Sequence, residues 1–370
     1  MRSIALLCLI QIFASTPSSA MAKKKKKEDI TQTLEVPKDP PGAVVADTQR
    51  LGFMVSPLSS KGLLSAQMRD AFRLLIKQAN GAQIVKLRAF TAGTGDMRRV
   101  LAIVSEVCTE KKIPLPAVSV VQVGGLPLDG AQVQLEAYTI GKMAVNPNGL
   151  AFVSGVGIST KNPLDPVQPL LEKAMADLKA AVEAAGAASQ DVLRITCLFS
   201  SLDDYPKLRS TIEAAFHAAV VASVMTQRGP SAGLAECEGV ARLTSPVGEP
   251  LKFLSPPSMN PSPNYSKIAL VGSPKIVLSG TQMAFHNEDS DVRLAFSRLD
   301  KALDAVQSSL KLVVFSSLYP LSNSMLTKIR NIRFEFYDKT RPPASTMVLF
   351  EGLPSMDASF GIDVIAVPRP

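Results

Sequence analysis

The stretch "LLEKAMADLKAAVEAAGAASQDVLRITCLFS", residues 170–200, decides the fold because it holds a helix, the end of that helix and a strand in direct succession. Its apolar residues recur at the three- and four-residue spacing of an amphipathic helix, and Gly186 follows them as a C-cap glycine would. Val192 to Phe199 is an apolar run that predicts a strand. Just upstream, "GLAFVSGVGIS", residues 149–159, predicts a hairpin-like pair of short strands.

The segment downstream completes one structural unit. Asp203 and Asp204 are well placed to cap a second helix, from Tyr205 to about Ala219. Two further strands are expected near residues 220–227 and 234–242. The unit therefore has the order ββαβαββ.

The same order of elements recurs on both sides of this unit. Toward the C terminus we expect a hairpin at 275–285, strands at 310–316, 344–354 and 360–367, and helices at 292–309 and 324–337. Toward the N terminus we expect strands at 50–56, 84–93, 116–127 and 131–140, and helices at 66–82 and 96–108. The chain then divides into a possible signal peptide with a Lys-rich tail, two repeats, a Pro/Ser-rich linker and a third repeat: 1–45, 46–142, 143–244, 245–264 and 265–370.

This order predicts an α+β fold in which the two helices of each repeat cover one face of a mixed sheet. The opposite face is also apolar, as the strand residues at 118–123 and 347–350 indicate. Two helices cannot cover both faces, so the other two repeats are the simplest cover. We therefore expect three tandem repeats packed around a common axis as an intramolecular pseudotrimer.

The formal net charge of +8 comes mostly from the N-terminal region. Arg2 and the lysine run at 23–27 account for six of the 40 basic residues, and the remaining 34 nearly balance 32 acidic residues. The body of the chain lacks the clustered Lys/Arg with interleaved aromatics that a nucleic-acid interface shows. We therefore expect no specific nucleic-acid partner, and we interpret the lysine run as a solvated tail.

The four cysteines lie far apart without a C-x-x-C pair, and there are only two histidines. A zinc site needs closely spaced ligand pairs, so we expect no metal site. Cys108, Cys197 and Cys237 fall within apolar periodic segments. That setting favours buried free thiols over disulfides or a catalytic nucleophile.

The first 22 residues contain an apolar core and an A-x-A ending that are typical of a secretory signal. The lysine run directly after them reverses the charge bias that export requires. We favour translation from Met21 and a cytoplasmic protein; the alternative is export after cleavage near Ala22. No other stretch is apolar for long enough to span a bilayer, so we expect no membrane span in the mature chain.

Several motifs occur in a fixed order along the body of the chain. They are the serine-glycine pairs at 154–155 and 279–280, the helix-glycine-"DV" phrase at 184–192, a "PA-x-S" turn before an apolar strand that ends in Leu-Pro, and the closing strand "AECEGVA" at 235–241. This ordered set resembles the RidA/YjgF family, also called L-PSP endoribonuclease or reactive intermediate deaminase proteins. The resemblance covers about residues 46–368 in three copies.

The resemblance implies a chorismate-mutase-like fold, which family members build from three separate chains. For this chain it implies a monomeric pseudotrimer with clefts between repeats that hold a small-molecule ligand, and no cofactor. Family deaminases hydrolyse enamines or imines; an arginine in the "PARS" turn binds the substrate carboxylate, and a glutamate in the last strand helps position water.

At the position of that arginine the chain has Val118, Val220 or Val221, and Ser345 in the three repeats. At the position of the glutamate it has Gln134, Glu236 and Gly361. Glu236 is therefore the candidate catalytic residue. The candidate ligand-binding residues are Ser154, Gly155, Ser279, Gly280, Val118, Ser345, Gln134 and Arg88.

Each serine-glycine pair also has a purely structural interpretation as a turn. Arg88, Arg209 and Arg341 are candidate substitutes for the missing arginine, although we expect each of them to be an ordinary solvent-facing charge.

The sequence thus predicts a RidA-like protein that has lost the carboxylate-binding arginine in all three repeats and that binds a small molecule or serves as a scaffold. The alternative is an enamine or imine deaminase, a hydrolase that acts on an uncharged substrate. An RNA endonuclease is less favoured, because the lysine run is its only support.

Overall fold

Three β-sheets, each covered by two helices, make up the unit Pro37–Pro370 of the computed structural model, which describes residues 36–259 and 261–370. The first sheet has the order β2 (Leu51–Val55), β5 (Val133–Ile140), β3 (Gln83–Thr91), β4 (Ala117–Gln122), with helices α1 (Leu64–Gln78) and α2 (Arg98–Lys111). The second has the order β10 (Leu251–Leu254), β11 (Ile268–Val271), β6 (Leu150–Thr160), β9 (Gly233–Arg242), β7 (Val192–Phe199), β8 (Val220–Met225), with α3 (Val167–Ala184) and α4 (Tyr205–Ala215). The third has the order β1 (Ala43–Asp47), β12 (Lys275–Ser279), β16 (Ala358–Ala366), β14 (Val313–Pro320), β15 (Ala344–Met347), with β13 (Gln282–Phe285) also on β16, and with α5 (Asp289–Asp304) and α6 (Asn323–Ile332).

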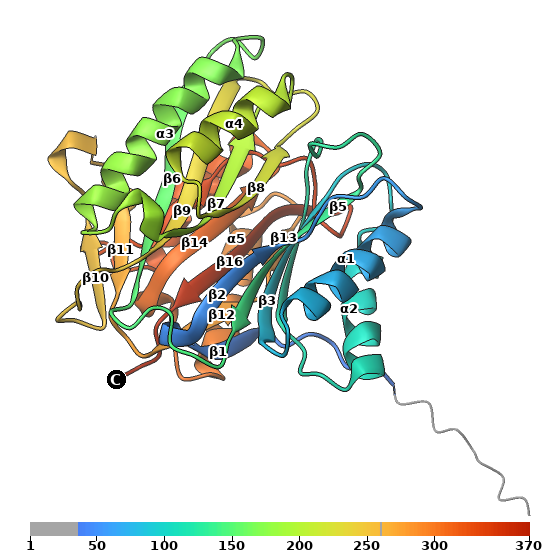
Figure 1. Cartoon of the computed structure of the whole chain (residues 1–370), viewed down its shortest axis with the longest axis horizontal. Coiled ribbons are helices and arrows are strands. Elements are labelled where there is room, and N and C mark those ends of the chain that lie inside the picture. Colours follow the sequence, from blue (N-terminus) through green and yellow to red (C-terminus); the bar gives the residue numbers. More distant parts are fainter. Residues whose placement is uncertain (1–35, 260) are drawn as a thin grey trace, which may run out of the picture. The chain divides into compact units, whose positions relative to one another are not determined.

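The strand connections are the same in all three sheets. The strand after the first helix pairs antiparallel with the last strand and parallel with the strand after the second helix: β3 with β5 and β4, β7 with β9 and β8, and β14 with β16 and β15. Figure 1 shows α1 and α2 together on one sheet and α3 and α4 together on another. The α+β fold is therefore confirmed.

Local signals set the ends of the second unit. α3 ends at Ala184, and Gly186 follows with φ +76°, the left-handed conformation expected of a C-cap glycine. Asp204 occupies the N-cap of α4, but its side chain makes no capping hydrogen bond, so the predicted side-chain cap is wrong. The residue has φ 54°, a left-handed backbone rather than the extended one that a capping aspartate needs.

The two predicted hairpins are not hairpins. β6 is one continuous strand, and Ser154 and Gly155 form a bulge within it, between Val153 and Val156. β12 and β13 run along the same partner, β16, with Gly280 in the interruption between them. The serine-glycine pairs bend a strand without reversing it, as β-bulges do.

Some strands pair with a sheet other than the one that their place in the sequence predicts for them. The Pro/Ser-rich segment 245–264 contains β10, which pairs with β11, and β11 pairs in turn with β6. β1 pairs with β12 of the third sheet, although β2 follows it directly in the chain. The segment read as an extended linker therefore contributes a strand to the second sheet.

Each sheet packs against its own two helices through a separate apolar core. Two further cores hold side chains from all three sheets: Tyr138, Phe152 and Phe315 in one, and Phe90, Leu198 and Tyr319 in the other. Strand contacts link the sheets in a cycle, β2 to β8, β6 to β15 and β12 to β4. The apolar faces opposite the helices are buried against one another.

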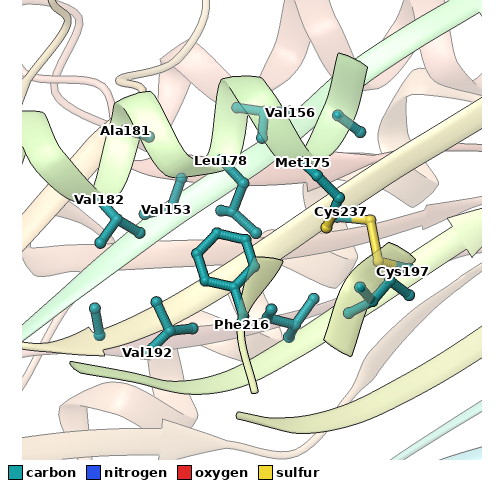
Figure 2. Packing of buried hydrophobic residues seen from close by; sticks show 14 of the residues in the cluster. Val153, Val156, Met175, Leu178, Ala181, Val182, Val192, Cys197, Phe216 and Cys237 are labelled. Carbon is teal, nitrogen blue, oxygen red and sulfur yellow. A yellow bond between two sulfur atoms is a disulfide. The ribbon is translucent and has the colours of Figure 1, made fainter. Parts of the chain in front are cut away.

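Cys197 and Cys237 form a disulfide within the core between α3 and its sheet (Figure 2). They lie directly opposite each other on β7 and β9. The expectation of free thiols is therefore wrong for these two residues, whereas Cys108 is buried and forms no disulfide within the described part of the chain. The bonded pair is 40 residues apart in sequence, so only strand register brings the two sulfur atoms together.

The signal-like segment and the lysine run lie outside the described residues. Within residues 36–259 and 261–370, no helix combines the length and the hydropathy needed to cross a bilayer.

Candidate functional site

The serine-glycine bulge of β6 lies against β15 of the third sheet. The Ser154 hydroxyl donates to the carbonyl of Ser266 at 2.6 Å and accepts from the backbone N–H of Ser345 at 2.9 Å. The backbone N–H of Gly155 donates to Oγ1 of Thr346 at 3.1 Å. The structure thus brings together three candidates from two separate repeats of the sequence, Ser154, Gly155 and Ser345.

Glu236 on β9 completes this group, which we call the β6–β15 site. A Cβ placed on Gly155 would lie 2.0 Å from Oε1 of Glu236, so the close approach of the carboxylate requires glycine at this position. The described part of the chain offers this carboxylate no hydrogen-bond partner. Burial, together with the negative charge of Glu238, raises the pKa of Glu236 to about 7, and Lys267 opposes that rise.

Lys267 and Tyr265 also belong to the β6–β15 site, and the sequence did not single them out. The Lys267 carbonyl accepts from the backbone N–H of Ser154 at 2.9 Å. Its ammonium donates to the Tyr265 hydroxyl at 2.9 Å and lies 4.8 Å from the centre of that ring. Both residues stand at the edge of the supposed linker, where no motif recurs; only the pairing of β11 with β6 brings them to Ser154.

The three positions matched to the carboxylate-binding arginine occupy the same place in their sheets. In each sheet, one residue of the strand after the first helix pairs with a buried acid of the last strand. The matched position pairs with the residue just before that one. The pairs are Val118 with Leu87, Val221 with Ile195, and Ser345 with Ser316. Of the two alternatives in the second repeat, register selects Val221. Val118, Val221 and Ser345 are each 6% exposed, and none of the three carries a charge.

The second serine-glycine pair lies against β4 of the first sheet. The N–H of Thr281 donates to the carbonyl of Val118 at 3.2 Å, and a Cβ on Gly280 would lie 2.9 Å from the same oxygen. The Ser279 hydroxyl accepts from the N–H of Val364 at 2.8 Å. Ser279, Gly280 and Val118 are therefore neighbours, but they form a backbone junction between sheets.

The positions matched to the family glutamate also share one register. The facing pairs are Gln134 with Phe90, Glu236 with Leu198, and Gly361 with Tyr319. Gln134 is buried, and Oε1 of its amide finds no partner among the described residues. Only Glu236 has an acid at this position.

Arg88 does not face solvent, so the prediction of a solvent-facing charge is wrong for this residue. It is buried, and its guanidinium donates to Glu136 at 2.7 Å, Thr196 at 2.9 Å and Glu238 at 2.7 Å. Arg209, in contrast, makes a partly exposed ion pair with Glu213 on α4. The partners of Arg88 come from the first and second sheets, which places it between sheets and not in the β6–β15 site.

Arg88 belongs to a buried ionic network in two parts: Arg88 and Arg194 pair with Glu136 and Glu238 between the first and second sheets, and Lys86 pairs separately with Asp363 of the third sheet. Its bases are Lys86, Arg88 and Arg194, and its acids are Glu136, Glu238 and Asp363. Burial would by itself raise the pKa of Glu238, but Arg88 and Arg194 hold it below its ordinary value. Burial lowers the pKa of Lys86 despite the opposing charge of Asp363. With three charges of each sign, the network places no net formal charge in the interior.

Residues 137–243 match the protein-family model described as Endoribonuclease L-PSP. Through this segment, the chain belongs to the RidA/YjgF family. The matched segment of this RidA/YjgF protein contains β6, α3, β7, α4, β8 and β9, and with them Ser154, Gly155 and Glu236.

Solved structures that resemble this RidA/YjgF protein have low sequence identity to it. A protein of the conserved Rid family, YyfB from Yersinia pestis, is 18% identical, with 32% of this chain and 98% of that chain covered and a TM-score of 0.30. Yeast Mmf1 is 19% identical, with 32% and 99% covered and a TM-score of 0.23. A member of the YjgF/YER057c/UK114 family from Mycobacterium tuberculosis is 20% identical, with 31% and 98% covered and a TM-score of 0.23. The sequence matches none of the curated proteins.

Proposed function

We propose that the chain is a single-chain pseudotrimer of three RidA-like repeats that no longer anchors a substrate carboxylate through the family arginine, and that acts as a small-molecule binder or scaffold. Support for the pseudotrimer comes from the common strand connections and from the cyclic contacts between sheets. The two apolar cores shared by all three sheets take the place of the faces that separate chains would bury.

One observation supports the loss of the carboxylate-binding arginine. Val118, Val221 and Ser345 share one register position and are buried and uncharged. A carboxylate at any of these positions would lose its water without gaining a guanidinium partner. At the β6–β15 site the backbone N–H of Ser345, a possible donor, is already taken by Ser154.

Crystals soaked with 2-oxo acids and aromatic acids test this proposal. We expect no carboxylate to be bound at the three positions. Ordered density for a carboxylate held at Val118, Val221 or Ser345 would overturn the loss of the anchor.

Hydrolysis of an uncharged imine or enamine at the β6–β15 site is the second candidate, and the unpartnered Glu236 favours it. A carboxyl group with a pKa of about 7 can both accept and return a proton near neutral pH. In this reaction the Glu236 carboxylate takes a proton from water as the oxygen adds to the imine carbon. It returns that proton to the nitrogen, which gives a carbinolamine. It then takes the hydroxyl proton of the carbinolamine and delivers it to the same nitrogen as the carbon–nitrogen bond breaks, which yields a carbonyl compound and ammonia.

An assay of ammonia release from imines generated in solution tests this candidate. Wild-type protein should accelerate the release, and Glu236→Gln should abolish the acceleration while the variant keeps its fold. Glu213→Gln, on the surface of α4, is the matched control. Equal rates with and without wild-type protein would eliminate the candidate.

A further inference from the structure

A cavity of about 650 Å³ opens between the second and third sheets, and none of the residues of the β6–β15 site lines it. Its walls come from residues 247–251 and Phe253, the segment 272–275 between β11 and the start of β12, the turn just before β14, the loop before β15 and the segment after β16. A second cavity of about 460 Å³ shares Glu249, Phe253 and Arg341 with it. The Pro/Ser-rich segment is therefore a wall of a binding-sized cavity as well as a connection.

Much of the wall is apolar. Leu251 and Phe253 come from β10, Leu312 precedes β14, and Val367 follows β16. These four side chains come from three separate parts of the chain that only the tertiary structure brings together. They offer one continuous surface on which a hydrocarbon chain or ring can be buried.

The charges around this apolar wall are mainly positive. The basic lining residues are Lys275, Lys311, Arg341 and Arg369, and the acidic ones are Glu249 and Asp338. The Asp338 carboxylate is already engaged, since it accepts from the N–H of Thr340 at 2.9 Å and from its hydroxyl at 2.7 Å. Arg369 is likewise paired, with Asp304 at 2.7 Å.

Arg341 and Lys311 hydrogen-bond to neutral carbonyl groups, and neither forms an ion pair within the described residues, although the Arg341 charge helps to lower the pKa of Asp338. The Arg341 guanidinium donates to the carbonyl of Leu251 at 2.8 Å and lies 5.8 Å from the centre of the Phe253 ring. The Lys311 ammonium donates to the carbonyl of Tyr337 at 2.9 Å. Pre-ordered cations beside an apolar wall lose little side-chain entropy when an anion binds.

We propose that this cavity binds an amphipathic anion, a carboxylate or sulfonate with a short hydrocarbon tail. The acid group lies beside Arg341, with the exposed Lys275 as a second cation of the same cavity, and the tail lies on Leu251, Phe253 and Leu312. This assignment extends the proposed function, because it places a ligand at a site that shares no residue with the β6–β15 site. It also gives Arg341, which the sequence left as an exposed charge, a specific role.

Calorimetric titration of the full chain with octanoate, 1-octanol and acetate tests the proposal. Octanoate should bind, whereas the neutral alcohol and the tail-less acid should bind at least about tenfold more weakly. Arg341→Gln and Lys275→Gln should each weaken octanoate binding by up to about tenfold and by a measurable factor. Arg209→Gln, which removes an exposed charge on α4, should leave binding unchanged.

Lys275→Gln keeps the test decisive if Arg341→Gln does not fold, because Lys275 is exposed and its side chain makes no hydrogen bond within the described residues. No octanoate binding, binding unaffected by both substitutions, or equal affinity for 1-octanol would each overturn the proposal. None of these outcomes bears on Glu236, so failure here is separate from failure of imine hydrolysis.

Discussion

The surroundings of Glu236 favour the protonated, uncharged form of its carboxyl group. It lies beside Gly155, with Glu238 two residues away on the same strand and Lys267 opposing the effect of burial. Because burial penalises the charged form, the folded chain holds this proton more tightly than the unfolded chain does. Stability and proton transfer at this residue are therefore linked.

We expect Glu236 to make the free energy of unfolding depend on pH. Its pKa rises from 4.5 to about 7 on folding, so its contribution is greatest below about pH 4.5 and falls as pH rises through about 7. Glu236→Gln should flatten this dependence and should be more stable than wild type at about pH 8. Urea denaturation at several pH values measures the effect; a wild-type curve that Glu236→Gln leaves unchanged would contradict it.

The buried guanidinium of Arg88 is hydrogen-bonded to side chains of two different sheets. Its three partners lie on β5, which is in the same sheet as Arg88, and on β7 and β9, which are in the second sheet. Arg88→Ala would leave Glu136 and Glu238 buried with one cation fewer. Loss of one partner from a buried ion pair costs about 3–5 kcal/mol, so we expect a decrease of that size in the free energy of unfolding.

Arg209→Ala is the matched control for Arg88→Ala, because its ion pair with Glu213 is partly exposed. Its effect should stay within about 1 kcal/mol. Similar losses for the two variants, measured by urea denaturation, would show that the network contributes no more than a surface pair.

At the scale of elements, the disulfide joins β7 to β9 beneath α3 (Figure 2). Reduction should lower the free energy of unfolding by about 2–4 kcal/mol, because the bond restricts the unfolded chain across a separation of 40 residues. Cys197→Ala combined with Cys237→Ala should show a similar loss and no further sensitivity to reductant. Denaturation curves that coincide with and without reductant would contradict the bond.

The same bond bears on where the protein resides. Structural disulfides persist in oxidising compartments and are rare in the cytosol. A bonded pair at Cys197 and Cys237 is expected in an exported protein, and reduced thiols are expected in a cytoplasmic one. The mass of the mature chain from its native host decides between them, since cleavage near Ala22 and a start at Met21 give different N termini.

At the scale of the whole molecule, no repeat is expected to be self-sufficient. Residues 143–244 expressed alone would expose Phe152, Leu198 and Val240, which the complete chain buries between sheets. They would also leave the edge of β6 unpaired, because β11 lies outside the segment. We expect the isolated segment to associate or aggregate, as measured by light scattering after size exclusion; a stable folded monomer would contradict the pseudotrimer.

The sequence by itself determined the order of elements from the first helix of each segment onward, as the helix ended by Gly186 and the strand Val192–Phe199 illustrate. It also indicated the apolar inner faces and the absence of charge at Val118 and Ser345. These features follow from periodicity and end signals that act over a few residues, so they can be read locally. Only the tertiary structure decided which distant residues meet: β1 with β12, Cys197 with Cys237, and Lys86 with Asp363 across 277 residues. Such pairings depend on how three sheets pack and align, which no local pattern in the chain specifies.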